Sequence, residues 1–414
     1  MKFNDLREVL AYIETRTNFE LGLIRVNVFL EKAEIDYESL KYIHIGGTNG
    51  KGSTAFYISE CLSASDYKVG MFSSPSIISH NDRIRINGEF ISDKNIVDFI
   101  NEYYDLIEET KLTMFEIDVV MALDYFIKNK VDIAIMEVGM GGEYDGTNII
   151  DPLLSIITNV GLDHTKYLGD TKKDIALTKA GIIKENSLVL IGEKDTKIKE
   201  VIKSVALDKN AMVFEVGEPS IKSHLPIIFD YKQYKDIQLK ALADYQIMNV
   251  SLVLDALDIL NDYYGIEVKE STIYDILKTK SWLGRFELLS FDPLIIIDGA
   301  HNVEGVQQLC KSIDKFKDYH KSIMFAALED KQTDEMVSML ASSADEMIIS
   351  EFDFYRTKKA EDINKNFNYE IALDYQEYIK NKVNSMDKND MFVITGSLYF
   401  ISQVRKFVVD TLNL

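Results

Sequence analysis

The sequence is poor in cysteine and has no long hydrophobic run, and both shortages narrow the class of protein. Its 414 residues include two cysteines, Cys61 and Cys310, which lie too far apart for a disulfide framework or a zinc site. No apolar run reaches the roughly 18 residues that a membrane span needs. The opening stretch, MKFNDLREVL, lacks the apolar segment of a signal peptide. We therefore expect a soluble, cytoplasmic protein.

Positive charge is also scarce. The chain carries 46 Lys and Arg against 67 Asp and Glu, which gives a formal net charge of -21. This charge repels nucleic acid and anionic membranes, so any recognition of phosphate must be local. We therefore expect small-molecule partners, and neither nucleic acid nor a membrane. The length suggests two or three domains.

Short apolar runs alternate with amphipathic ones in the first part of the chain. Strands are expected at 41–47, 68–74, 131–139, 153–161 and 187–192, and helices at 93–109, 115–129 and 172–184. Continuous apolar strands separated by helices predict a mainly parallel sheet that is covered on both faces. Residues 211–241 alternate like a small antiparallel ribbon, and a long helix follows over 245–263.

A second alternating stretch follows residues 286–293, which we interpret as a linker around Pro293. Strands are expected at 294–300, 322–328, 346–350 and 391–397, and helices at 303–317, 332–342 and 373–387. A last helix is expected after the strand 391–397 and ends at about residue 409. We predict an α/β protein. A P-loop NTPase-type domain with a mainly parallel sheet, 1–287, precedes a smaller Rossmann-like α/β domain, 288–414.

The stretch GGTNGKGS, residues 46–53, approximates the phosphate-binding pattern G-x-x-x-x-G-K-[ST]. Glycines let backbone N–H groups approach phosphate oxygens, and the N-terminus of the next helix favours the same anion. Lys51 supplies a charge toward the β and γ oxygens, and Ser53 offers a hydroxyl near magnesium. Because a strand precedes this stretch and a helix follows it, we expect a nucleoside triphosphate and not an empty turn.

Other polar residues stand at the ends of the predicted strands. Ser74 follows the second strand, and Glu137 ends an apolar strand, where a buried carboxylate calls for a cation such as magnesium. His164 lies beyond another strand end. Taken alone, Arg83 and Arg85 are typical of charges on a strand surface, and Lys179 is typical of a solvated lysine on a helix.

Together with further motifs, these segments resemble the folylpolyglutamate synthase/dihydrofolate synthase family of the Mur-ligase superfamily. The motifs are LGLIRV (21–26), GGTNGKGST (46–54), SSPSIISHNDRIRINGE (73–89), MFEIDVVMALDYF (114–126), EVGMGGEYDGTN (137–148), TNVGLDH (158–164), LGDTKKDIALTKAGI (168–182), YQIMNVSLVLDAL (245–257), WLGRFE (282–287), IDGAHNVEG (297–305) and TGSLYF (395–400). They occur in this order over nearly the whole chain.

The resemblance implies roles for individual residues. ATP would be bound by Asn49, Gly50, Lys51, Gly52, Ser53, Asn249, Arg285, Asp298 and His301. Magnesium would be ligated by Ser74, Glu137 and His164, and catalysis would involve Lys51, Lys179, His164 and Arg285. Lys179 matches a lysine that similar enzymes carry as a carbamate. Leu21, Gly22, Leu23, Thr113, Met114 and Phe115 would line a pterin site.

The chain departs from the family pattern at four positions. Ser76 stands where histidine is frequent, Glu143 where arginine is frequent, Thr178 where glutamate is common and Tyr245 where histidine is common. These departures leave the residues expected to bind ATP intact. They leave open which folate the protein uses.

The implied reaction is ATP-dependent addition of L-glutamate to a folate, to dihydropteroate or to both, through an acyl phosphate. The resemblance also implies a monomer, with glutamate on the C-terminal side of an interdomain cleft and a hinge near 286–293. Three alternatives remain: a P-loop NTPase that acts as a binding switch without ligation, a cell-wall Mur-type amino-acid ligase that holds a UDP sugar, and a degenerate binding protein.

Overall fold

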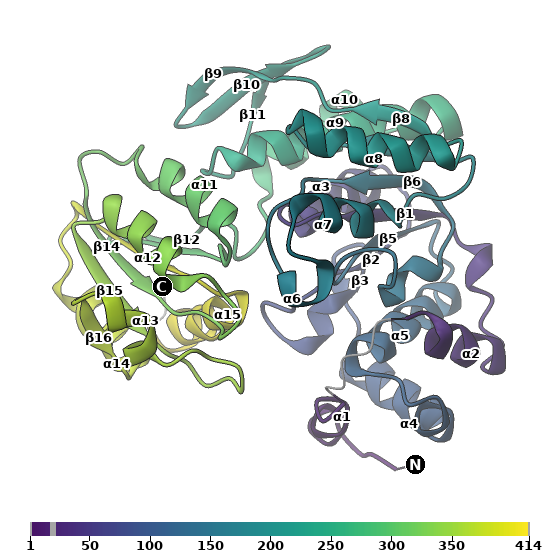
Figure 1. Ribbon diagram of the computed structural model, residues 1–414, viewed down its shortest axis with the longest axis horizontal. Coiled ribbons are helices and arrows are strands. Elements are labelled where there is room, and N and C mark those ends of the chain that lie inside the picture. The colour runs from purple at the N-terminus through teal and green to yellow at the C-terminus, as the bar shows by residue number, and fades with distance from the viewer. Residues whose placement is uncertain (1, 17–21, 413–414) are drawn as a thin grey trace. The chain divides into compact units, whose positions relative to one another are not determined.

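The computed structural model describes residues 2–16 and 22–412 (Figure 1). The described chain divides into two compact units. Unit 1 comprises residues up to 218 together with 248–276, and unit 2 comprises 219–247 together with 277 onward. Each unit has its own central sheet.

The central sheet of unit 1 has eight strands in the order β4-β3-β2-β5-β1-β6-β7-β8. They are β1 (Tyr42–Gly46), β2 (Val69–Phe72), β3 (Ile84–Ile86), β4 (Glu89–Phe90), β5 (Ile133–Glu137), β6 (Pro152–Ile157), β7 (Leu188–Ile191) and β8 (Met212–Glu215). All neighbours pair in parallel except β3, which is antiparallel to both β2 and β4. The predicted mainly parallel sheet is confirmed.

Helices pack on this sheet in two groups. The elements are α1 (Leu6–Ile13), α2 (Ile24–Lys32), α3 (Lys51–Ser63), α4 (Asp93–Thr110), α5 (Met114–Lys128), α6 (Thr165–Leu168), α7 (Lys172–Ala180), α8 (Thr196–Asp208), α9 (Tyr245–Tyr264) and α10 (Glu270–Thr279). One core cluster joins α1, α2, α4 and α5, and includes the fully buried Phe29 and Phe126. Another joins α7 and α8 to β6 and β7. Burial of these apolar faces is the main force that holds the layers together.

The predicted ribbon over 211–241 is confirmed for residues 220–238, whereas residues 212–215 form β8 of the main sheet, and the predicted long helix is confirmed. The strands β9 (Ser220–His224), β10 (Ile227–Tyr231) and β11 (Tyr234–Gln238) form a three-stranded antiparallel sheet. Three of five β10 residues are buried, in strict alternation, which is the pattern of a sheet with one covered face. Helix α9 then runs for 20 residues.

The sheet of unit 2 has the order β12-β13-β17-β14-β15-β16. Its elements are β12 (Glu287–Phe291), β13 (Leu294–Asp298), α11 (Val303–Ile313), β14 (His320–Phe325), α12 (Thr333–Ser342), β15 (Glu346–Ser350), α13 (Ala360–Ile363), β16 (Glu370–Ala372), α14 (Tyr375–Ser385), β17 (Asp390–Thr395) and α15 (Leu398–Phe407). All strands but β12 are parallel. A second α/β domain is confirmed, whereas its predicted boundary at 287/288 stays a prediction.

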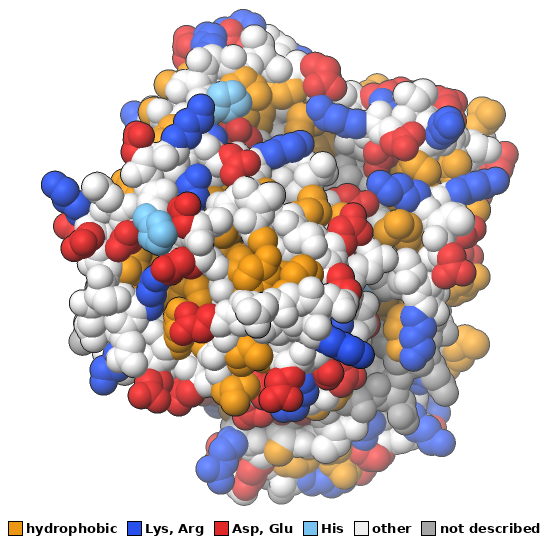
Figure 2. All heavy atoms as spheres, turned by 60° about the vertical axis from the view of Figure 1, so that its left-hand side comes forward, with side chains coloured by type: hydrophobic (Ala, Val, Ile, Leu, Met, Phe, Trp, Pro, Cys, Tyr) orange, Lys and Arg blue, Asp and Glu red, His pale blue; other side chains and the backbone are white. Residues whose placement is uncertain are grey.

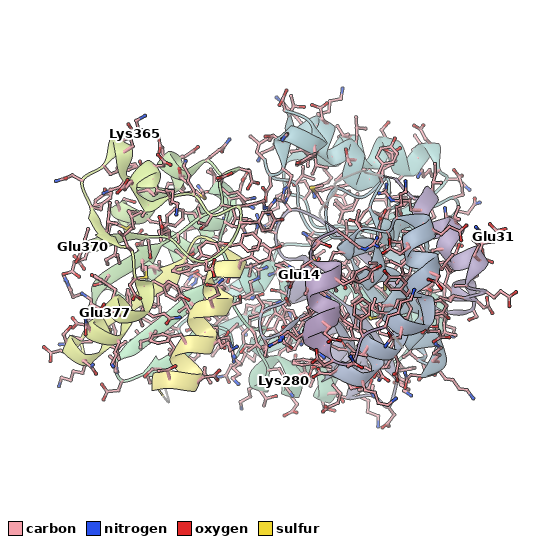
Figure 3. All side chains as sticks on the ribbon, turned by 90° about the horizontal axis from the view of Figure 1, so that it is seen from below. Glu14, Glu31, Lys280, Lys365, Glu370 and Glu377 are labelled. Carbon is pink, nitrogen blue, oxygen red and sulfur yellow. The ribbon has the colours of Figure 1, made fainter. Side chains whose placement is uncertain are left out.

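The predicted linker is wrong. Residues 287–291 form β12, which pairs antiparallel with β13 across a tight turn at Asp292 and Pro293. The hinge expected there loses its basis, because the ladder hydrogen bonds tie these residues to the sheet. The opposite edge strand, β16, was not predicted. It has three residues and carries Glu370, which points outward as Glu377 of α14 does (Figure 3). Short length and charge protect such an edge against further pairing.

The distribution of charge on the surface and the character of the helices both follow from the composition, which is rich in charged residues and has no long apolar run. Acidic and basic side chains are interspersed over the face seen in Figure 2, with small hydrophobic patches between them. Among the helices in the described part of the chain, none combines the length and the apolar character needed to cross a membrane.

A close approach between β2 and α5 yields a test of this packing. A Cβ added at Gly70 would lie 2.7 Å from a ring carbon of the fully buried Phe126. Gly70→Ala should therefore lower the free energy of unfolding by about 1–3 kcal/mol, measured by urea denaturation. Gly146→Ala is the control, because its Cβ would meet nothing closer than 3.6 Å. Equal losses in the two variants would contradict the packing described.

Candidate active site

The glycine-rich loop has the geometry of a phosphate cradle. It leaves β1 at Gly46 and enters α3 at Lys51, with Gly50 as the N-cap in a left-handed conformation, φ 85°. Because glycine has no side chain, the N-cap residue Gly50 makes no capping hydrogen bond to this helix, and the helix N-terminus is suited to an anion. The Lys51 amine folds back over the loop, where it donates to the carbonyl oxygens of Gly47 at 3.1 Å and Thr48 at 3.3 Å.

The segment after β6 braces this loop. Thr158 Oγ1 donates to Asn49 O at 2.6 Å, and Asn49 N donates to the Asn159 side chain at 2.9 Å. Thr48 N donates to Asn159 O, and Gly161 N donates to Thr48 Oγ1 at 2.9 Å. A side chain at Gly47, φ 147°, would overlap Thr158 Oγ1. The loop is therefore held in one shape by bonds from residues 158–161.

Lys179 lies beneath the same loop. It stands in the last turn of α7, is 3% exposed, and donates to Gly47 O at 2.8 Å. Burial, followed by the charge of Lys51, lowers the pKa of its amine to about 7, although Asp163 and Asp145 act in the opposite direction. The interpretation of Lys179 as a solvated lysine is wrong, because α7 turns it into the protein.

Of the three predicted magnesium ligands in unit 1, Ser74 and Glu137 lie at strand ends and His164 lies at the start of α6. Glu137 ends β5 and is 4% exposed, and its Oε2 accepts a bond from Ser74 N at 3.3 Å. Ile45 of β1 is paired in register with Glu137, so this carboxylate stands beside the start of the glycine-rich loop. His164 is the N-cap of α6, with a left-handed backbone, φ 51°. Within the described residues, no three His, Cys, Asp or Glu side chains form a metal-binding cluster.

Asn249 of α9 also reaches the loop. A Cβ at Gly50 would overlap Oδ1 of Asn249, so the absence of a side chain at Gly50 makes room for this amide. Asn249 is 7% exposed. The structure thus brings Asn49, Gly50, Lys51 and Asn249 together from widely separated positions, and their role in binding ATP stays a prediction.

The two segments predicted to line a pterin site meet at the N-termini of α2 and α5. Thr113 caps α5 in a capping box with Glu116, and Arg25 of α2 donates to the Glu116 carboxylate at 3.0 Å. Phe115 packs edge-on against Phe72, with ring centroids 5.7 Å apart. Gly22, Leu23 and Met114 belong to the described residues, whereas Leu21 lies outside them.

Asp298 organises the predicted residues of unit 2. Its Oδ2 accepts bonds from the Tyr245 hydroxyl at 2.6 Å and Phe286 N at 2.7 Å, and its Oδ1 accepts one from Ala300 N at 2.8 Å. Burial raises the pKa of this carboxyl, which is 2% exposed. Arg285 donates to Gly299 O at 3.4 Å, and Nδ1 of His301 donates to the same oxygen at 2.8 Å. The side chains of Arg285 and His301 therefore share one backbone carbonyl, that of Gly299, as a hydrogen-bond acceptor.

Sequence reasoning missed the buried carboxylate Asp145 and misplaced two arginines. Asp145 accepts bonds from Thr147 Oγ1 at 2.6 Å and Met140 N at 2.8 Å, and burial raises its pKa. A methyl group at Gly139 would meet both Phe115 and Asp145, so the two face one space. An acid after a glycine-rich strand end was the available signal. Arg83 and Arg85, expected on a strand surface, are 5% and 8% exposed.

Two family models match the chain. The model of the Mur ligase middle domain matches residues 45–257. The model described as Mur ligase, glutamate ligase domain, matches residues 284–398.

Individual proteins are similar to this chain over nearly its full length. The dihydrofolate synthase/folylpolyglutamate synthase of Bacillus subtilis (strain 168) is 33% identical over 98% of this chain and 99% of its own. The E. coli FolC structure in complex with DHPP and ADP has a TM-score of 0.89 and 26% identity, and 99% of each chain is covered. A bifunctional folylpolyglutamate synthase/dihydrofolate synthase with Mn, AMPPNP and L-glutamate bound has a TM-score of 0.86 and 26% identity, over 99% of this chain and 98% of that one. The chain therefore belongs to the folylpolyglutamate synthase/dihydrofolate synthase family of Mur ligases.

Proposed function

We propose that the protein is an ATP-dependent ligase that forms an amide between L-glutamate and the carboxylate of a folate, of dihydropteroate or of both. The observation that carries this proposal is the glycine-rich loop, which residues 158–161 brace and over which Lys51 folds. The relatives that bind ADP, AMPPNP, DHPP and L-glutamate support it.

The proposed reaction solves a chemical problem. A carboxylate is a poor electrophile, because its oxygens are poor leaving groups. Transfer of the γ-phosphoryl group of ATP to the carboxylate makes an acyl phosphate, and the glutamate amine then displaces phosphate. Positioning and neutralisation of charge supply most of the catalysis in such transfers. Lys51, at the N-terminus of α3, would stabilise the charge that develops on the phosphate oxygens.

The residues at the strand ends fit a divalent ion that is shared with a nucleotide. Magnesium commonly takes one or two protein carboxylates and completes its shell with phosphate oxygens and water. Glu137, with its low exposure of 4%, and Ser74 beside it meet that need without a cluster of acids, and we assign His164 as a further ligand. When bound, the ion would neutralise negative charge on the phosphates.

Roles for the remaining predicted residues stay proposals. We assign ATP contacts to Arg285, Asp298 and His301, and a flat heterocycle to the walls around Leu23 and Phe115. The match of residues 284–398 to a glutamate ligase domain supports placing glutamate binding in the part of the chain after 288. The glycine-rich loop, before this boundary, would bind the ATP phosphates, and Asp298 and His301, after it, would add further contacts. A monomer, implied by the family, can be checked by light scattering.

We further propose that Lys179 carries a carbamate. A pKa of about 7 leaves much of its amine neutral near neutral pH, and the neutral form is the nucleophile. Attack on carbon dioxide forms an N–C bond and releases one proton, which leaves an anion. The change replaces a buried cation that Lys51 repels with an anion that both Lys51 and a divalent ion attract.

The ligase is tested by its products. With ATP and magnesium, dihydropteroate and a reduced folate are offered separately, and mass spectrometry should show each accepted substrate heavier by one glutamyl residue. Phosphate release should require both glutamate and the pteridine substrate. Phosphate release without either would instead favour the NTPase switch, and use of a UDP sugar would favour a cell-wall ligase.

Lys51→Ala should abolish ATP-dependent ligation while the fold persists. The variant loses the charge over the loop but no core packing, so activity should fall at least about 100-fold, the scale for loss of one electrostatic stabiliser of a transition state. Initial rates and circular dichroism are the measurements. Lys365→Ala is the control, because this lysine is exposed on unit 2 and points outward (Figure 3). Full activity of Lys51→Ala would refute the cradle.

The carbamate predicts a dependence on pH and bicarbonate. Because the neutral fraction of the Lys179 amine rises as pH increases through about 7, enzyme held in carbon dioxide-free buffer below this pH should lose activity. Bicarbonate added above it should restore the activity, and labelled bicarbonate should give a carbamate signal by NMR. Lys179→Ala should lack both the signal and most activity. An active Lys179→Ala variant would leave the residue without this role.

A further inference from the structure

A buried carboxylate of α5 has no part in the reaction outlined above. Asp118 is fully buried, with 0% exposure. Its Oδ1 lies 2.7 Å from Nε2 of His80, and its Oδ2 accepts a bond from Nη1 of Arg83 at 3.1 Å. Both partners belong to the short 3-10 helix His80–Arg83, between β2 and β3. Asp118 thus ties the middle of α5 to this connection.

A backbone hydrogen bond at Arg83 joins the two ends of this connection. Ser73 N donates to Arg83 O at 2.9 Å, so Arg83 joins the end of the segment 73–83 to its beginning. Within it, Oδ2 of Asp82 accepts bonds from Ile77 N at 2.8 Å and Ile78 N at 2.6 Å. The next amide after Ser73, that of Ser74, reaches Glu137. A path of bonds therefore runs from Asp118 through Arg83 to the proposed magnesium ligands.

Charge makes Asp118 hard to replace in this path. Arg83 is 5% exposed, and its Nε has no hydrogen-bond partner among the described residues. Asp82, which precedes Arg83 in the sequence, already lies 3.9 Å from Nη2 of Arg85 and accepts the amides of Ile77 and Ile78. Without the Asp118 charge, the guanidinium of Arg83 would be a buried cation lacking its counter-charge, which favours rearrangement of the segment.

We propose that Asp118 is a positioning residue that holds segment 73–83 in the shape that places Ser74 beside Glu137. It acts through Arg83 and His80, and touches neither substrate nor metal. The consequence is that ligation reaches half its maximal rate at a lower concentration of the divalent ion than it would without the Asp118 carboxylate. This inference rests on the proposed function only for that consequence, because the ordering of the segment can be measured on the chain alone.

The experiment compares Asp118→Asn with Asp124→Asn. Asp124 stands on the same helix and is 7% exposed, but its carboxylate pairs with Lys128 at 2.8 Å. Hydrogen exchange of residues 73–83, without ligands, should be about tenfold faster in Asp118→Asn, since a bond to a charged group is lost. The free Mg²⁺ concentration that gives half-maximal ligation should rise by about the same factor. Asp124→Asn should match the wild type in both.

Unchanged exchange and an unchanged magnesium requirement in a folded Asp118→Asn variant would overturn the proposal, as would a change in melting temperature alone. Should Asp118→Asn not fold, the proposal is tested by comparing hydrogen exchange in two variants of His80. His80→Gln retains an N–H donor toward Asp118, whereas His80→Leu removes it. Faster exchange in the leucine variant alone supports the proposal, and equal exchange in the two refutes it. A wild type without ligase activity would refute the proposed function, and the exchange result would still decide the role of Asp118.

Discussion

The site depends on the shape of four residues, 47–50, which the protein fixes before any ligand arrives. Thr158, Asn159 and Gly161 bond to this backbone from the neighbouring strand end. Gly47 and Gly50 allow the close approach, because a side chain at either would overlap Thr158 or Asn249. Since β6 pairs with β1 in parallel, the brace is a product of the sheet order. A cradle held in this way loses little entropy when it binds an anion.

The amines of Lys51 and Lys179 both bond to that backbone, and their proximity decides the charge at the site. Lys51 and Lys179 both donate to Gly47 O, at 3.1 and 2.8 Å. Lys51 is partly exposed, whereas Lys179 is buried, and burial lowers the pKa of the Lys179 amine to about 7. Like charges in a medium of low polarity repel strongly. The proposed carbamate on Lys179, or a bound anion, would relieve this repulsion.

The sequence was most informative where the signal is local. Apolar runs such as 133–137 and the glycines of residues 46–52 predicted the parallel sheet and the loop, because both patterns act within a few residues. The burial of Arg83 and Lys179 was not predicted, since it depends on how α5 and α7 pack. Strand β12 was missed because Pro293 is typical of a linker and is equally suited to the tight turn into β13. Asp145 lay within a recognised motif, but its burial beside Phe115 appears only in the fold.

The departures from the family pattern can now be weighed by position. Glu143 is exposed, so it adds no charge to the buried part of the site, and the Thr178 hydroxyl turns back to Asp174 O at 3.1 Å. Tyr245 retains what a histidine could give at this place, a donor to the buried Asp298, at 2.6 Å. That bond opposes the rise in the pKa of Asp298 that burial causes. Because a buried carboxylate is stable only when its oxygens are bonded, the phenol replaces histidine without leaving Asp298 short of a donor.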